Sequence, residues 1–311
     1  CITVDEFVRL NQSVIRTMKT VLLKNTVLEI KLRQTLDFIR EEGINPLNVN
    51  ELLTNLVAVL GSIGSEEVAL GNLINRLGAG IVDVSPAIAT LADVTAVNNS
   101  VTSLMKTIVQ KNMVLLRKLR STVQFIEFAL STGVVFPADI LTALQGVIRN
   151  NLIRSISVEE SGLAQLISGE SAKFARALSI RLTADELLTL NASITGVIDT
   201  VVQKNMILEA KLEETIALIG LLDFSPNILT LIADALTVIQ GTIALEENAL
   251  ARIIQLEADK LNQIIALAPG QIDVLIAANE SVTSLLESIT LKNMILEQKA
   301  EEVINFIQSN T

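Results

Sequence analysis

One pattern recurs four times along the chain and limits what it can fold into. Each copy begins with Asn-x-Ser-(Val/Ile), and a Lys-Asn pair follows with its Lys 11 residues after the Ser. The four lysines are Lys24, Lys111, Lys204 and Lys292, which lie 87, 93 and 88 residues apart. A regular internal repeat of this length is typical of proteins that stack one supersecondary unit on the next.

A second repeated element, which contains two adjacent glutamates, lies between these copies. The pairs are Glu66-Glu67, Glu159-Glu160 and Glu246-Glu247, separated by 93 and 87 residues. We name the first element A and the second B, so the chain reads A-B-A-B-A-B-A. The predicted units are three helical repeats at 1–84, 85–181 and 182–269, and a terminal half repeat at 270–311.

Both elements have the periodicity of long helices. In the first A element, Phe7, Val14, Val21 and Leu28 recur every seven residues, as in a helix seam. The predicted helices span residues 3–42, 48–82, 86–130, 138–180, 184–221, 226–267 and 270–309. The predicted fold is therefore all-α, with long antiparallel helices in either an open repeat array or a closed up-and-down bundle.

Cap signals support these helix starts. Thr3 and Glu6 have the spacing of a capping box, and so do Thr183 and Glu186. Ser85-Pro86 and Ser225-Pro226 place a capping Ser before a Pro at the first helical position. The first B helix is the weakest prediction, because five glycines at 61, 64, 71, 78 and 80 lower its helix propensity and could split it.

Composition excludes most chemistry. The chain has no His, Trp or Tyr, so His-based proton transfer, His-ligated metals and aromatic stacking platforms are absent. Its net charge of -10 argues against nucleic acid and anionic lipid as partners. The longest interval without a charged residue, 52–65, is too short to span a bilayer. We therefore predict no enzyme activity, cofactor, metal or small-molecule substrate, and we do not expect a membrane partner.

The asparagines are the most informative polar residues. Each A helix carries Asn at the same two seam positions, and the eight are Asn11, Asn25, Asn98, Asn112, Asn191, Asn205, Asn279 and Asn293. If the A helices lie side by side, these residues form two polar layers about 21 Å apart. We predict that they fix register, the best-attested use of a buried seam Asn. Partly exposed side chains without such a role, or a polar ligand site, are the alternatives. The glutamate pairs are expected either on a solvated face or as charges at a helix start.

The two ends of the array are candidate assembly surfaces. The first and last A helices keep apolar seams where repeat proteins normally carry polar caps. The candidate seam residues are Phe7, Val14, Val21, Leu28, Ile39, Leu275, Val282, Ile289, Leu296 and Ile307. In an open array they would face solvent unless another subunit covers them, so we expect self-association into a homo-oligomer or a head-to-tail polymer.

Cys1 is the single cysteine. An intermolecular disulfide, a lipid anchor and no role at all are the alternatives that the sequence leaves open.

The B segment Thr242-Ile-Ala-Leu-Glu-Glu-Asn-Ala-Leu-Ala and the A segment Lys204-Asn-Met-Ile-Leu-Glu-Ala-Lys-Leu resemble poorly characterised helical repeat proteins of spore-forming Firmicutes. The repeat of those proteins commonly carries a His where this chain has Asn72, Gln165 and Arg252. The resemblance implies a bacterial, spore-surface or extracellular setting and no known activity. We predict a structural subunit of an extracellular or spore-associated filament or layer. A membrane-active, pore-forming protein and a scaffold for a partner protein are the alternatives.

Overall fold

The computed structural model describes residues 2–222 and 224–310, and within them every regular element is a helix. The predicted all-α class is confirmed. The α-helices are α1 Val4–Glu42, α2 Val49–Val84, α3 Leu91–Ser131, α4 Ala138–Val147, α5 Arg154–Ser179, α6 Ala184–Leu221, α7 Pro226–Leu267 and α8 Ile272–Asn310. A 3-10 turn, η1 Ser85–Ala87, precedes α3, and a π turn, η2 Ile148–Ile153, joins α4 to α5 into one long B helix.

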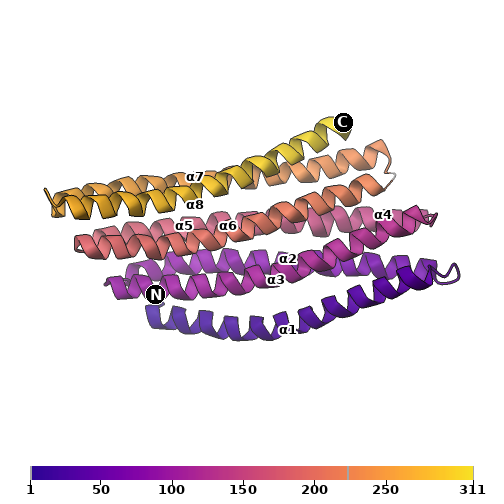
Figure 1. Ribbon diagram of the computed structural model, residues 1–311, viewed down its shortest axis with the longest axis horizontal. Helices are drawn as coiled ribbons and strands as arrows, with labels where there is room; N and C mark the ends of the chain where they lie inside the picture. Colours follow the sequence, from indigo (N-terminus) through magenta and orange to yellow (C-terminus); the bar gives the residue numbers. More distant parts are fainter. Residues whose placement is uncertain (1, 223, 311) are drawn as a thin grey trace.

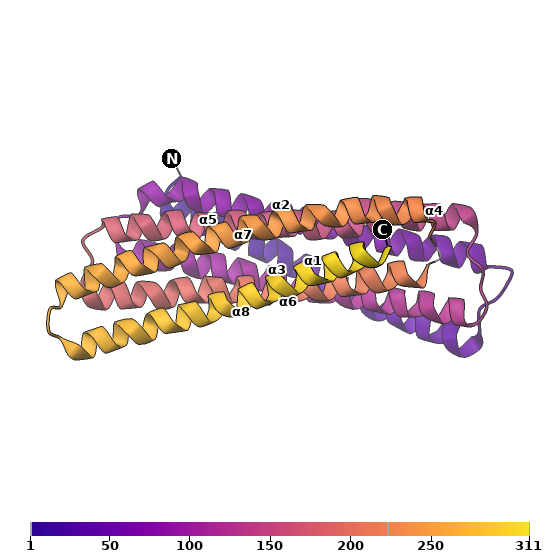
Figure 2. The same ribbon diagram turned by 90° about the horizontal axis from the view of Figure 1, so that it is seen from above.

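The helices form an open array of two layers (Figures 1 and 2). The A helices α1, α3, α6 and α8 lie side by side in one layer, each packed on the next, and α2, α5 and α7 do the same in the B layer. Helix α1 and helix α8 lie at opposite ends (Figure 1). Of the two predicted arrangements, the structure is therefore the open repeat array, and the A helices run parallel to one another.

Capping boxes begin three of the A helices, α1, α3 and α6. Thr3 with Glu6 and Thr183 with Glu186 form the predicted capping boxes. The prediction that the second A helix begins at Pro86 is wrong. The Ser85 hydroxyl instead donates to the Ile81 carbonyl at 2.6 Å, which ends α2, and Pro86 enters only a single 3-10 turn. Helix α3 starts after Thr90, which forms its own capping box with Asp93.

The glycines of α2 leave it one continuous helix, in agreement with the predicted span 48–82. Gly64, Gly71 and Gly78 recur every seven residues on the face that packs against η2 and α5. A Cβ atom at Gly78 would lie 2.5 Å from the main chain of Gln165. The glycines therefore bring two helix backbones into direct contact, and this packing offsets their low helix propensity.

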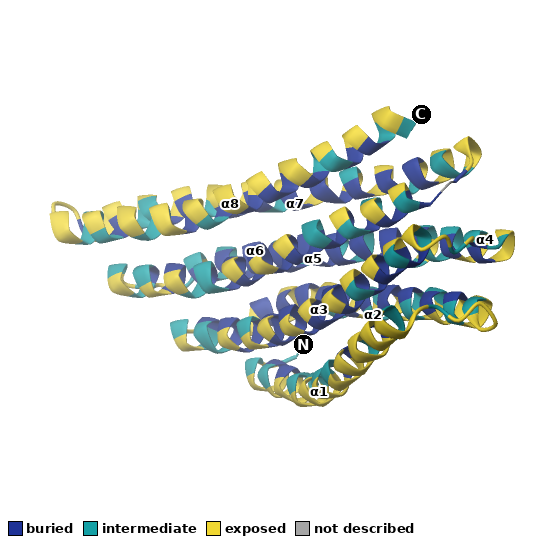
Figure 3. Cartoon of the chain, turned by 45° about the vertical axis from the view of Figure 1, so that its right-hand side comes forward, coloured by how far each residue is buried: buried dark blue, intermediate teal, exposed yellow. Residues whose placement is uncertain are grey.

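Burial follows position in the array. The sandwiched helices are mostly buried, whereas α1 and α8 each keep a long exposed side (Figure 3). One continuous apolar core runs through all the repeats from Phe7 of α1 to Phe306 of α8. Every internal repeat is therefore covered on two sides and the two terminal A helices on one.

Gly78→Ala tests the backbone contact between α2 and α5. The added methyl group must push two helix backbones apart, so we expect about 1–3 kcal/mol of destabilisation in urea denaturation followed by circular dichroism. Gly196→Ala in α6 is the matched control, because nothing lies within 4 Å of its Cβ position. The control should be neutral or gain up to about 1 kcal/mol from helix propensity. Equal losses in both variants would contradict the close-contact role.

Candidate assembly interface

The first asparagine of each A helix connects it to the next A helix. The Asn11 amide donates to the Ser100 hydroxyl at 3.0 Å, and the Asn98 amide donates to the Ser193 hydroxyl at 2.6 Å. The Asn191 amide donates to the Ser281 carbonyl at 2.5 Å. Residues two apart on a helix point in nearly opposite directions. The Asn-x-Ser sequence thus places a donor on one side of each A helix and an acceptor on the other.

The second asparagine joins a charged cluster between the layers. The Asn25 amide donates to the Glu66 carboxylate at 3.1 Å, and its carbonyl accepts from Lys118 at 2.6 Å. The Asn205 amide likewise donates to Glu246 at 3.3 Å, and its carbonyl accepts from Lys299. Asn112 is fully buried in the middle of the array, where its amide donates to the Ile108 carbonyl.

Two lysines, seven residues apart on each A helix, supply the positive charges of these clusters. The first lysines of α3, α6 and α8 bind the first glutamates of the preceding B helices, and the pairs are Lys111–Glu66, Lys204–Glu159 and Lys292–Glu246. The second lysines reach back to second glutamates one B helix earlier: Lys211 lies 3.0 Å from Glu67, and Lys299 binds Glu160. Lys211 also contacts Glu159 at 3.0 Å.

The prediction that the glutamate pairs lie on a solvated face is wrong for four of the six glutamates. Glu67, Glu159, Glu160 and Glu246 are fully buried, whereas Glu66 is half-buried and Glu247 is exposed. Each B helix is covered by its neighbours, and the lysines that neutralise the carboxylates come from A helices far away in sequence. The repeated Lys-Asn-x-x-Leu-x-x-Lys spacing identifies the second lysine in the sequence, but it does not identify the residues that this lysine contacts.

Burial changes the protonation of these clusters. Burial, reinforced by the nearby Glu160 carboxylate, raises the pKa of Glu246 to about 8. Burial acts to raise the pKa of Glu160, but the positive charges of Lys299 and Lys292 together with a hydrogen bond from Glu246 keep that pKa below its ordinary value. Burial lowers the pKa of Lys211. Glu160 therefore loses its proton at a lower pH than Glu246 does.

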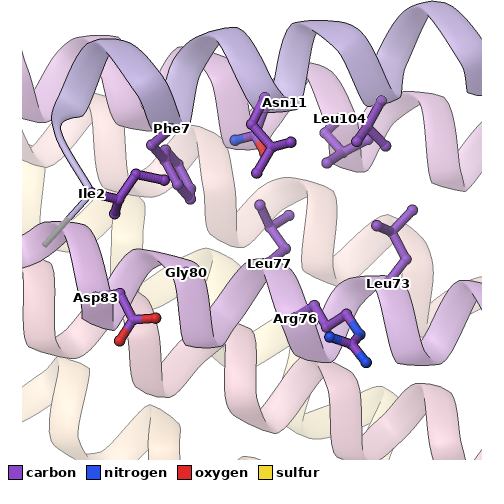
Figure 4. Close-up of a pocket in the computed structure, with 11 residues that line it drawn as sticks. Ile2, Phe7, Asn11, Leu73, Arg76, Leu77, Gly80, Asp83 and Leu104 are labelled. Carbon is purple, nitrogen blue, oxygen red and sulfur yellow. The ribbon is translucent and has the colours of Figure 1, made fainter.

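A cavity of about 700 Å³ opens between α1 and α2. Figure 4 shows Phe7 and Asn11 of α1 facing Leu77 and Gly80 of α2. Helix α5 carries Lys173 where α2 carries Gly80, and the Lys173 ammonium donates to the side-chain Oδ1 of Asn98. Gly80 leaves room instead for the Phe7 ring, which lies 3.0 Å from its Cβ position. The first repeat thus replaces a buried lysine with an aromatic contact.

In α3, α6 and α8, one face packs against the preceding A helix. The outward face of α1 is the equivalent face. Leu10, Val21, Leu28 and Phe38 are exposed on α1, whereas their counterparts in α3 are buried, and Leu28 itself is 44% exposed. Of the predicted seam residues of α1, Val21 and Leu28 lie on this face and Val14 and Ile39 are partly buried. The prediction is wrong for Phe7, which is buried against α2.

The outward face of α8 is equivalent to the opposite face, which in α1, α3 and α6 packs against the following A helix. Leu286 and Ile304 are exposed there, as are Asn279 and Asn293, the two asparagines without a following A helix. The other six predicted asparagines are buried. Among the predicted seam residues, Leu275, Val282 and Ile307 are partly buried. The prediction is wrong for Ile289 and Leu296, whose side chains pack inside the array. Cys1 lies outside the described residues.

Three carboxylates gather where α6 meets α8. Oxygen atoms of Glu209, Glu213 and Glu302 lie within 4.8 Å of one another, and none of the three residues is fully buried. Burial raises the pKa of Glu302 to about 7, and the carboxylates of Glu213 and Glu209 reinforce the shift. The three carboxylates therefore repel one another when all are ionised, and protonation of Glu302 removes part of this repulsion.

Three segments of the chain, residues 54–126, 147–219 and 232–307, match the family described as alpha-helical endospore appendage domain, and together they cover well over half of the chain. Each match begins in a B helix and ends in the A helix after it, and α1 lies outside all three. No curated protein matches the chain.

Among solved structures, one similar chain is described as "Computational Design of Self-Assembling Cyclic Protein Homooligomers". It is 10% identical, and the alignment covers 96% of this chain and 99% of that chain. The TM-score of 0.19 is too low for this similarity to carry an argument.

Lys211→Met tests the buried clusters. It leaves Glu67 and Glu159 without one of their cations, so we expect about 3–5 kcal/mol of destabilisation in urea denaturation. Lys31→Met is the matched control, because Lys31 occupies the same repeat position on α1 but is exposed. In dilute protein its effect should stay within about 0.5 kcal/mol. Similar losses in both variants would show that burial of the cluster contributes nothing.

Glu302→Gln tests the acidic group through its pH dependence. Because the folded-state pKa of Glu302 is raised to about 7 from 4.5, folding favours its protonated form, and wild-type stability should fall as pH rises between these values. We therefore expect the melting temperature of Glu302→Gln, relative to that of wild type, to rise as the pH increases from about 4 to about 8. The exposed neighbour in Glu301→Gln controls for the loss of charge alone. A constant difference between Glu302→Gln and wild type would contradict the shift.

Proposed function

This chain belongs to the alpha-helical endospore appendage family, and we propose that it is a structural subunit whose copies join head to tail to build a spore appendage. The family is one of spore appendages, so the chain is a spore-surface protein. The match is to a structural domain and not to an enzyme family. The observations below support the self-association of this chain.

One observation carries the proposal: the two ends of the array are complementary halves of an interface that the chain already makes three times. Helices α1 and α3, α3 and α6, and α6 and α8 pack in the same way. In each pair the first asparagine of one helix donates to the serine position of the next helix. In two of the three pairs the second asparagine also accepts from a lysine of that next helix. Helix α8 exposes the asparagine half and α1 exposes the serine and lysine half.

The position of these halves determines the kind of assembly. They lie on opposite sides of the array along the direction in which its helices stack (Figure 1), so contact between two copies is head to tail. A head-to-tail contact that does not close on itself generates a filament. Apolar side chains at both ends, such as Leu28 and Leu286, supply the burial that drives association.

The membrane-active alternative has one observation in its favour. Helices α2, α7 and α8 are long and apolar enough to cross a bilayer by length and composition. The same helices carry Glu67, Glu246 and Lys292, which form ion pairs inside the array and would be costly to expose to lipid. Leakage of dye-loaded liposomes at concentrations where the protein stays monomeric would favour this alternative.

Leu28→Glu tests assembly through the α1 face. Its counterpart Leu115 is fully buried, so a charge at Leu28 should prevent docking of a second copy. We expect light scattering and negative-stain electron microscopy to show filaments for wild type and monomers for Leu28→Glu, with equal melting temperatures. Leu47→Glu is the control, because Leu47 is 91% exposed in the loop after α1. Wild-type protein that stays monomeric at all concentrations would overturn the proposed function.

A covalent contribution from Cys1 is a separate part of the proposal. Comparing filaments with and without reductant, and in a Cys1→Ser variant, tests it. Filaments that resist dilution only when Cys1 is present and oxidised are the expected result. Unchanged resistance would assign assembly to the helix faces alone.

A further inference from the structure

The second lysines of the A helices make a repeated buried contact, which the first of them does not make. They are Lys31, Lys118, Lys211 and Lys299, each seven residues after the first lysine. Three of them are buried and cross to the neighbouring A helix or to an earlier B helix. Lys31 is the exception, because the described chain has no helix before α1 and its side chain is exposed.

The partners of the three buried lysines show what Lys31 would require. Lys118 donates to the second asparagine of the preceding A helix, Asn25, at 2.6 Å. Lys211 binds the second glutamate of an earlier B helix, Glu67, at 3.0 Å. Lys299 makes both contacts, with Asn205 and with Glu160. A second lysine therefore takes one seam asparagine, one second glutamate or both.

The opposite end of the chain carries this pair of partners without a lysine. Asn293 follows Asn205 in the series of second asparagines, and Glu247 follows Glu160 in the series of second glutamates. Both residues are exposed, on α8 and α7 respectively. Within the part of the chain that the structure describes, neither Asn293 nor Glu247 makes the contact with a lysine that Asn205 and Glu160 make with Lys299.

We propose that Lys31 of one copy binds Asn293 and Glu247 of the next copy, and that this contact sets the register of the assembly. The inference rests on the proposed head-to-tail function and specifies its partner as a second copy of this chain. The contact repeats the arrangement of Lys299 with Asn205 and Glu160. It also joins opposite charges, because the α1 end presents a lysine where the α7–α8 end presents a glutamate.

The first asparagines predict a second contact across the same junction. Asn11, Asn98 and Asn191 each donate to the serine segment of the next A helix. Asn279 is exposed at one end and Ser13 is exposed at the other. The internal contacts Asn11–Ser100 and Asn25–Lys118 have the same separations along their helices as Asn279–Asn293 and Ser13–Lys31. When Lys31 pairs with Asn293 across the junction, Ser13 therefore lies opposite Asn279. The contact of Lys31 and the contact of Ser13 therefore require the same register.

The test uses charge reversal in two single variants. Lys31→Glu places two carboxylates at the junction and Glu247→Lys places two ammonium groups there. Each variant should raise the critical concentration for assembly by about tenfold or more. Both residues are exposed, so melting temperatures of the monomers should not change. Lys19→Glu is the matched control, because its counterpart in α3, Lys106, stays exposed inside the array.

Mixing the two single variants gives the sharpest result. The glutamate introduced by Lys31→Glu on one copy meets the lysine introduced by Glu247→Lys on the other, and the second junction keeps the native pair. An equimolar mixture should therefore assemble although neither variant does so alone, and the double variant should also assemble. If wild type assembles and Lys31→Glu behaves like Lys19→Glu, the register contact is wrong while the proposed function stands. If wild type does not assemble, the proposed function fails first.

Discussion

Buried contacts between lysines of one helix and glutamates or asparagines of its neighbours organise this structure. Lys211, for example, lies 3.0 Å from both Glu67 and Glu159, and all three side chains are buried. Burying such charges costs solvation, and a lone partner would be strongly destabilising. A helix that slipped by one turn would move each lysine away from its carboxylate. The apolar faces, which repeat every seven residues, would tolerate that slip far better.

The same contacts explain why the array is open. Each internal interface needs an asparagine side and a lysine side, and every A helix carries both on opposite faces. Such a helix cannot satisfy both sides in a two-helix hairpin, so the pattern propagates from one repeat to the next. Among the described helices, the lysine side of α1 and the asparagine and glutamate side of α7 and α8 have no neighbouring helix. The glycine contacts between α2 and α5 add a second constraint in the B layer, because no side chain separates those backbones.

The family match agrees with this description of the repeats. Its units pair a B helix with the A helix that follows, and α1 remains outside them. The structure packs the same pairs side by side, α2 with α3 and α7 with α8 (Figure 1). The first A helix is therefore the element with the least support from its own chain, and Figure 3 shows its long exposed side. A subunit with such a helix at one end is suited to assembly.

The sequence by itself determined the helices, their order and the repeat, because hydrophobic periodicity, capping boxes and the spacing of Asn, Ser and Lys act within a few helical turns. It also located the eight asparagines and the apolar character of the terminal helices. It failed where a neighbour decides the outcome. The glutamate pairs looked solvated, and Phe7, Ile289 and Leu296 looked available for assembly. Only the tertiary structure decided these cases, because burial and charge pairing depend on helices far away in sequence, and no local pattern encodes which face they cover.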